Sequence, residues 1–216
     1  MSKLILIPKV AAQGILGVFI FGLYIIIYLF FIGAVITGGL YVYSHVTDHF
    51  HHSVSSVPTN QPYIAIKDNF KILFPSAPTP TNSSTNIASV NVPYTTYQVQ
   101  SNNSNTLYAV AVYNLPANNP NFPISTTAEQ KSFLQQWVNG TPTSSNGVTT
   151  SLLSSSFINF KGYSTASSHY LDTGDGERLN TYQYVFLKGT ALYVIITVGL
   201  PQSIFNTFAN SFQLIN

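Results

Sequence analysis

The sequence predicts an α+β protein in which one membrane-spanning helix precedes a mainly antiparallel β-sheet flanked by helices. Three observations support this. No Asp, Glu, Lys or Arg occurs between Val10 and Thr47. Further along, short runs of alternating apolar and polar residues are separated by turn residues, which is typical of antiparallel strands. Two segments, 126–138 and 201–212, carry apolar residues at the spacing of a helix.

The composition excludes several classes of function. Charged residues make up 6% of the 216 residues, against roughly 25% in ordinary soluble proteins. The formal net charge of +2 provides no basic surface for a nucleic acid partner. Because the chain has no cysteine, disulfides, thiolate chemistry and cysteine-ligated zinc are excluded.

Residues 1–44 are predicted to form a cytoplasmic tip and a signal-anchor transmembrane helix. The most apolar part runs from Ile15 to Tyr43, which is longer than the ~20 helical residues that cross a bilayer. It also exceeds the 7–15 residues of a typical signal-peptide core and lacks a clear small-residue cleavage site. We therefore expect one uncleaved span, with the lipid bilayer as its partner.

The flanking charges predict the orientation of this span. Lys3 and Lys9 precede it, and no Lys or Arg follows until Lys67. The positive-inside rule then places the N-terminus in the cytoplasm and the C-terminal domain outside a single-pass cell-membrane anchor. Ala34 and Gly38 have the small-xxx-small spacing that allows two helices to pack closely, so a homodimer through this helix is one open alternative.

Residues 45–62 are predicted to be a histidine-rich linker. If the helix continues outward, His45, Asp48, His49 and His52 share one of its faces. Neutral imidazole suits Zn²⁺, Cu²⁺ or Ni²⁺, so these four residues are a candidate metal site, with zinc as the possible ion. The alternative is a polar collar at the membrane exit, without a cofactor.

Residues 63–216 are predicted to form one extracytoplasmic domain. Its first strand, Phe70 to Phe74, stops at Pro75, and Ser76 to Asn91 is expected to be a loop because it is rich in Pro, Ser, Thr and Asn. Two alternating runs and a capped helix come next. They span Pro93–Gln100, Thr106–Leu115 and Thr126 or Thr127 to about Val138.

The second half of the domain is predicted to contain mostly hairpin-connected strands. They run over Thr149–Phe160, Tyr163–Asp172, Glu177–Leu187 and Thr190–Val198, with glycine turns at 174–176 and 188–189. A short helix opened by Pro201 follows, and 212–215 is expected to close as a last strand segment. The apolar centres of the Glu177 and Thr190 strands indicate a sheet that is covered on both faces.

Both ends of this domain resemble a known family. The opening Phe70-Lys-Ile-Leu-Phe-Pro75-Ser-Ala-Pro78 and the closing Phe205 to Leu214, with its Ser-Phe-x-Leu strand, are similar to those of bacterial PsbP-like domains. The resemblance covers about Phe70 to Ile215. The resemblance implies an antiparallel sheet sandwiched between helices (an α/β/α sandwich) and no enzymatic activity. The photosynthetic members of the family are accessory subunits that bind and stabilise a membrane complex, and their role is not carried over to this chain. No functional residue of the family can be matched one by one.

Other clusters have ordinary structural explanations beside the chemical ones. Asp172, Asp175 and Glu177 have some character of a calcium loop but lack its further ligands, so a charged hairpin tip explains them. His169 lies near Ser167, Ser168 and Asp172, but no nucleophile motif is present, and strand alternation places neighbours on opposite faces. Three N-glycosylation sequons begin at Asn82, Asn102 and Asn139.

Nine tyrosines lie on the predicted strands and raise the possibility of a binding face. Tyrosine combines apolar area with one hydroxyl and suits interfaces, although it is also a common strand residue. We therefore expect a non-enzymatic membrane-anchored protein that binds or scaffolds an unknown protein or cell-envelope partner. The alternatives are a metal-responsive envelope protein that uses the histidine cluster, and a hydrolase with an unrecognised site.

Overall fold

An eight-stranded antiparallel sheet forms the middle layer of the domain. The computed structural model describes residues 62–87, 89–100, 105–122, 124–139, 144–145, 148–174 and 176–215. The strand order in the eight-stranded sheet is β3-β4-β5-β10-β9-β8-β7-β6. The predicted anchor and nearly all of the linker lie outside the described residues. Within the described ranges, no helix has the length and apolar character that a bilayer span requires.

The bounds of the elements agree with most of the predictions. The main sheet contains β3 (Thr79–Ile87), β4 (Val90–Gln100), β5 (Leu107–Asn114), β6 (Ser144–Ser145), β7 (Val148–Phe160), β8 (Tyr163–Gly174), β9 (Glu177–Lys188) and β10 (Ala191–Val198). A second, three-stranded sheet contains β1 (Tyr63–Ala65), β2 (Phe70–Ile72) and β11 (Gln213–Leu214). The helices are α2 (Thr127–Val138) and α3 (Gln202–Ser211).

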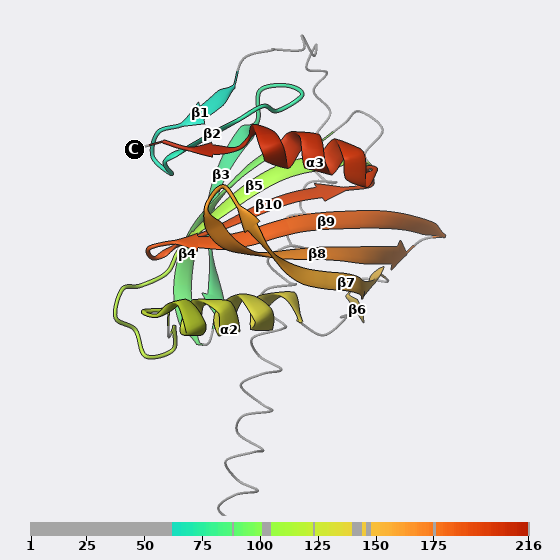
Figure 1. Ribbon diagram of the computed structural model, residues 1–216. Coiled ribbons are helices and arrows are strands. Elements are labelled where there is room, and N and C mark those ends of the chain that lie inside the picture. The colour runs from blue at the N-terminus through green and yellow to red at the C-terminus, as the bar shows by residue number, and fades with distance from the viewer. Residues whose placement is uncertain are drawn as a thin grey trace, which may run out of the picture.

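The two helices cover opposite faces of the main sheet, which confirms the antiparallel α+β prediction for the domain. Figure 1 shows α2 on one side, and α3 with the small sheet on the other. Under α2, the side chains of Phe133, Leu134 and Trp137 are buried against alternate residues of β4, β5, β9 and β10. Under α3, Phe205 and Phe208 are buried with the opposite alternation of the same strands.

Helix α2 begins where the sequence predicts, because Thr126 forms a complete capping box. Its Oγ1 accepts from the Glu129 backbone N–H at 3.2 Å, and its own N–H donates to Glu129 Oε2 at 2.8 Å. Two otherwise unpaired backbone donors are thereby satisfied.

One prediction was wrong: Ser76 to Asn91 is not a loop. Nine of its residues form β3, which pairs with β4 from Thr79↔Gln98 to Ile87↔Val90. The strand lies at the edge of the sheet and most of its side chains are exposed, so it needs no apolar alternation. Pro93 has no backbone N–H to donate, but it removes no hydrogen bond between β4 and β5, because the pairing of β4 with β5 starts only at Tyr94.

The last strand segment closes the small sheet instead of the main one. Gln213 and Leu214 pair with Lys71 and Phe70, so the two ends of the domain meet. Phe70 and Phe212 stack there with ring centroids 5.5 Å apart.

Candidate binding face

Strand β8 presents two different surfaces because its side chains alternate between the faces of the sheet. Tyr170 and Asp172 lie on the face that α2 covers, whereas His169 lies on the face of α3. Their cross-strand partners differ accordingly: Asp172 is opposite Leu179, and His169 is opposite Tyr182.

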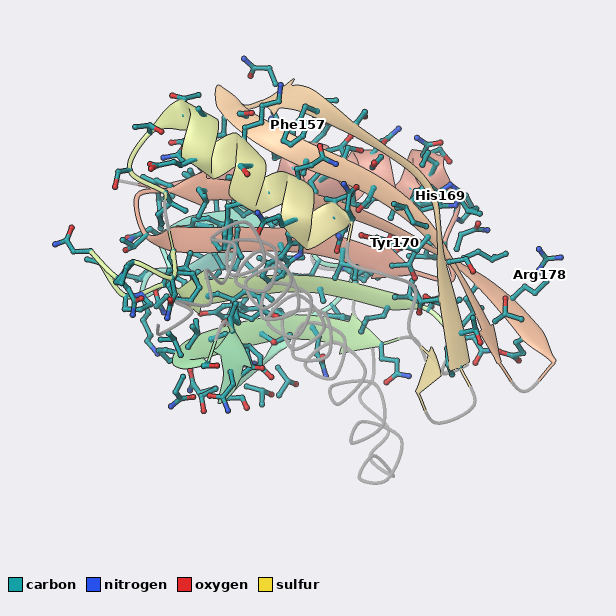
Figure 2. The ribbon with its side chains drawn as sticks, turned by 90° about the horizontal axis from the view of Figure 1, so that it is seen from below. Phe157, His169, Tyr170 and Arg178 are labelled. Carbon is teal, nitrogen blue, oxygen red and sulfur yellow. The ribbon has the colours of Figure 1, made fainter. Side chains whose placement is uncertain are left out.

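The polar residues on the α2 side form a structural network. The two carboxylate oxygens of Asp172 accept hydrogen bonds from Thr150 Oγ1 at 2.6 Å and Thr181 Oγ1 at 2.5 Å. The Tyr170 hydroxyl donates to the carbonyl oxygen of Val138 at 3.0 Å, next to the end of α2 (Figure 2). Burial raises the pKa of Tyr170 above its ordinary value. These bonds join three strands and fasten the end of the helix.

This network gives no support to the hydrolase alternative. A triad would need Asp172 to orient His169, but the carboxylate bonds two threonines on the opposite face of the sheet. Of the three carboxylates at the hairpin tip, Asp175 lies outside the described residues. Among the residues that are described, no three acidic or histidine side chains gather as metal ligands.

The opposite side of β7, β8 and β9 carries the candidate binding face. Its members are half-exposed or exposed polar and aromatic side chains whose positions alternate along three adjacent strands. We call this set the β7–β9 face, and it consists of Ser154, Ser156, Ser167, His169, Asn180, Tyr182 and Tyr184.

Ring contacts hold the aromatic members of this face in place. The imidazole of His169 stacks on Tyr182 with centroids 4.3 Å apart and planes 15° apart. Tyr182 stacks in turn on Phe205 of α3 at 5.8 Å, and Tyr184 meets the same ring edge-on at 4.7 Å. His169 Nε2 also lies 2.8 Å from Asn180 Oδ1, and this contact fixes the ring plane when Nε2 carries the proton.

The β7–β9 face is almost free of charge. His169 is its only titratable member besides the tyrosine hydroxyls, and it contains no Asp, Glu, Lys or Arg. The nearest cation along β9 is Arg178, two residues beyond Asn180 on the same face. Figure 2 shows it at the outer tip of the β8–β9 hairpin, away from both helices. The face therefore favours an uncharged partner surface over an ionic one.

The remaining predicted tyrosines divide into core and partly covered groups. Tyr94, Tyr97, Tyr113 and Tyr193 are buried. The Tyr97 hydroxyl donates to the buried carboxylate of Asp68 at 2.6 Å. Burial, together with this hydrogen bond, raises the pKa of Tyr97. Burial also raises the pKa of Tyr193 to about 12, and the nearby Asp68 adds to the effect.

These buried tyrosines predict a loss of stability in alkali. A tyrosine in the unfolded chain ionises near pH 10, while folded Tyr193 holds its proton up to about pH 12. Between these values the unfolded state binds fewer protons, so the free energy of unfolding falls as the pH rises. We expect Tyr193→Phe to make the free energy of unfolding fall less steeply with pH. The slope should decrease by up to the equivalent of one proton, or about 1.4 kcal/mol per pH unit. Urea titrations at pH 9, 10.5 and 11.5 measure it, and an unchanged slope would contradict the assignment.

Several candidate residues are not placed by the structure. The histidine cluster (His45, Asp48, His49, His52) and the helix pair Ala34 and Gly38 lie outside the described residues and stay predictions. Of the sequons, Asn102 lies outside the described residues. Asn82 is on exposed β3, where its Oδ1 accepts from Thr95 Oγ1 at 3.0 Å and from Lys67 Nζ at 3.3 Å. Asn139 is the exposed C-cap of α2, and its Oδ1 accepts from Gln135 Nε2 at 2.8 Å.

Solved structures include chains that are similar to this one. No family model matches the sequence, and no curated protein matches it significantly. The solution structure of cyanobacterial PsbP (CyanoP) from Synechocystis sp. PCC 6803 is similar, with a TM-score of 0.48 and 14% identity over 76% of this chain and 98% of that chain. A Pseudomonas aeruginosa protein of unknown function, PA94, has a TM-score of 0.34 and 8% identity over 57% of this chain and 85% of that chain.

Proposed function

We propose that this protein is a membrane-anchored binding protein whose C-terminal domain holds a partner protein against the β7–β9 face. The observation that carries the proposal is the rigid stack of His169, Tyr182 and Phe205, surrounded by serine hydroxyls and nearly free of charge. Aromatic side chains and a low charge density are the features that set the cores of protein interfaces apart.

The pre-formed rings favour a protein over a small molecule. The Tyr182 ring already stacks on His169 at 4.3 Å and also lies near-parallel to Phe205 at 5.8 Å, so part of its surface is already used by contacts within the domain. What remains exposed is a surface of hydroxyls, an amide and the outer side of an imidazole. Because its side chains lose little further freedom on binding, such a surface is suited to another folded protein.

The anchor completes the proposal. The charge-free segment between Val10 and Thr47 supplies the membrane attachment, and Lys3 and Lys9 hold its leading end in the cytoplasm. The domain would then meet its partner on the outer side of the membrane. Protease added to intact cells should digest the domain. Protection until lysis would reverse the sidedness, and recovery of the full chain in the soluble fraction without detergent would remove the anchor.

Site-specific photo-crosslinking tests the face itself. The full chain carries a benzophenone amino acid at position 167 on the face, or at position 84 on exposed β3 as the matched control. In the cells from which the protein comes, we expect a discrete adduct from position 167 and none from position 84. His169→Ala in the same chain should reduce the adduct at least fivefold while the domain stays folded.

The outcomes separate a specific face from general exposure. Equal adducts from both positions would show only that the domain surface is crowded. The absence of an adduct at position 167, with the chain at its normal level in the membrane, would overturn the proposed partner face. It would leave the anchor to be judged by the protease experiment.

A further inference from the structure

The outer edge of β7 is largely unpaired among the described residues. β7 is the longest of the described strands, with 13 residues, yet β6 pairs only with its Val148 and Thr149. From Thr150 to Phe160, the described part of the chain contributes no second neighbour beside β8. The stretch from Leu153 to Ser156 is exposed, with Leu153 at 53% of its full accessibility.

This edge has few of the features that prevent strands from pairing with other chains. Edge strands are usually protected by charged side chains, proline, bulges or a short length. β7 contains no charged residue and no proline, and its single irregularity is a bulge between Leu152 and Ser154. The opposite edge of the sheet, β3, is shorter and carries Pro80.

The sequence of β7 is complementary to an antiparallel copy of itself. With a two-fold axis at Ser155, Ser154 of one copy faces Ser156 of the other on the α3 side of the sheet. If the bulged Leu153 is skipped, Leu152 then faces Phe157 on the α2 side. Both of these side chains already pack partly against the core beneath α2.

A two-fold contact must be complementary to itself, and this register meets that requirement. It joins hydroxyl to hydroxyl and apolar to apolar, and the strand itself contributes no charge to the contact. Cross-strand pairs of these kinds stabilise antiparallel sheets. A partner with a charged or proline-containing strand would fit this edge less well than a second copy does.

We propose that two copies of this chain associate edge to edge through β7, with Ser155 on the two-fold axis, to form one continuous sixteen-stranded sheet. The axis runs perpendicular to the sheet, so the β7–β9 faces of both copies lie on the same side and adjoin each other. This interface is separate from any contact between the membrane helices, and it does not depend on the partner proposed above.

Engineered cysteines test the contact directly, because the chain has no cysteine of its own. In the full chain in native membranes, Ser155→Cys should form a disulfide dimer under mild oxidation, since directly opposed Cα atoms in antiparallel strands lie within disulfide range. Ser84→Cys, at an exposed position on β3, is the matched control. We expect at least a tenfold excess of crosslinked dimer for Ser155→Cys.

The register has its own test. Ser154→Cys and Ser156→Cys chains, co-expressed with different tags, should crosslink to each other more than either crosslinks to itself. Ser155→Lys introduced into both chains should reduce that crosslinking, because two ammonium groups would meet on the axis. Crosslinking of Ser155→Cys no stronger than that of Ser84→Cys would overturn the proposal. The same would follow if the Ser155→Lys change had no effect, whatever contact the membrane helices make.

Discussion

Replacing Phe212 by alanine is expected to lower the free energy of unfolding by about 3–5 kcal/mol, the usual cost of deleting a buried phenylalanine ring. Small domains are stable by only about 5–15 kcal/mol. The variant should therefore lose a large part of the stability of the domain, and its urea midpoint should fall accordingly. Urea denaturation of the full chain, followed by the fluorescence of its single tryptophan, Trp137, measures the loss.

The size of this effect follows from the position of the ring. Phe212 is 1% exposed and ends helix α3. It stacks on Phe70 of β2 at 5.5 Å and meets Phe186 of β9 edge-on at 5.6 Å. It also meets Tyr193 of β10 at 5.9 Å. One side chain thus joins the end of the domain to its beginning and to the centre of the main sheet, and the cavity left by its removal cannot collapse without moving several strands.

A control on the same helix separates this effect from a general weakening of α3. Ile204→Ala also shortens an apolar side chain of α3, but Ile204 is 39% exposed, so it should cost under about 1 kcal/mol. Phe212→Leu should fall between the two. If Phe212→Ala and Ile204→Ala shift the urea midpoint equally, the ring does not have the central role that its contacts indicate.

Local signals explain the elements that could be predicted from sequence. The capping box of Thr126 and Glu129 lies within four residues, so the start of α2 is visible without tertiary information. The apolar centres of β9 and β10 identify strands that are buried on both faces, and the glycine turn at 189 links them. In each case, the residues that determine the element are neighbours in the chain.

Non-local pairing explains what could not be predicted. β3 was missed because an exposed edge strand is held by backbone bonds to β4, and polar side chains such as Asn82 and Ser83 do not reveal them. The small sheet depends on pairs such as Leu214↔Phe70, which join opposite ends of the domain.

The candidate face was only partly foreseeable for the same reason. The many strand tyrosines indicated an interface, but alternation and register together decide which of them are exposed. Tyr182 lies opposite His169 only because β8 and β9 pair in one particular register. Tyr193, on the next strand, lies beneath the small sheet, where its hydroxyl donates to the backbone carbonyl of Asp68 at 3.0 Å.

Gly199→Ala is expected to destabilise the domain by more than about 3 kcal/mol, which is well above the typical cost of a point mutation. Gly199 follows β10 with a φ of +70°, and a Cβ built there would lie 1.9 Å from the backbone carbonyl oxygen of Asn105. Its own N–H donates to the Asn180 carbonyl oxygen at 2.8 Å, so the segment cannot move aside without losing that bond. Since the obstacle is backbone, no side-chain rotation relieves it.

Gly189→Ala provides the matched comparison. Gly189 also has a positive φ, +60°, but nothing lies within 4 Å of the position of a Cβ there. Alanine at 189 should therefore incur only the backbone strain of the left-handed region, about 1–2 kcal/mol. The difference between the two variants in urea denaturation isolates the contact with Asn105. Equal losses would mean that φ alone governs both sites, and that the close approach between the end of β10 and the residues before β5 relaxes at little cost.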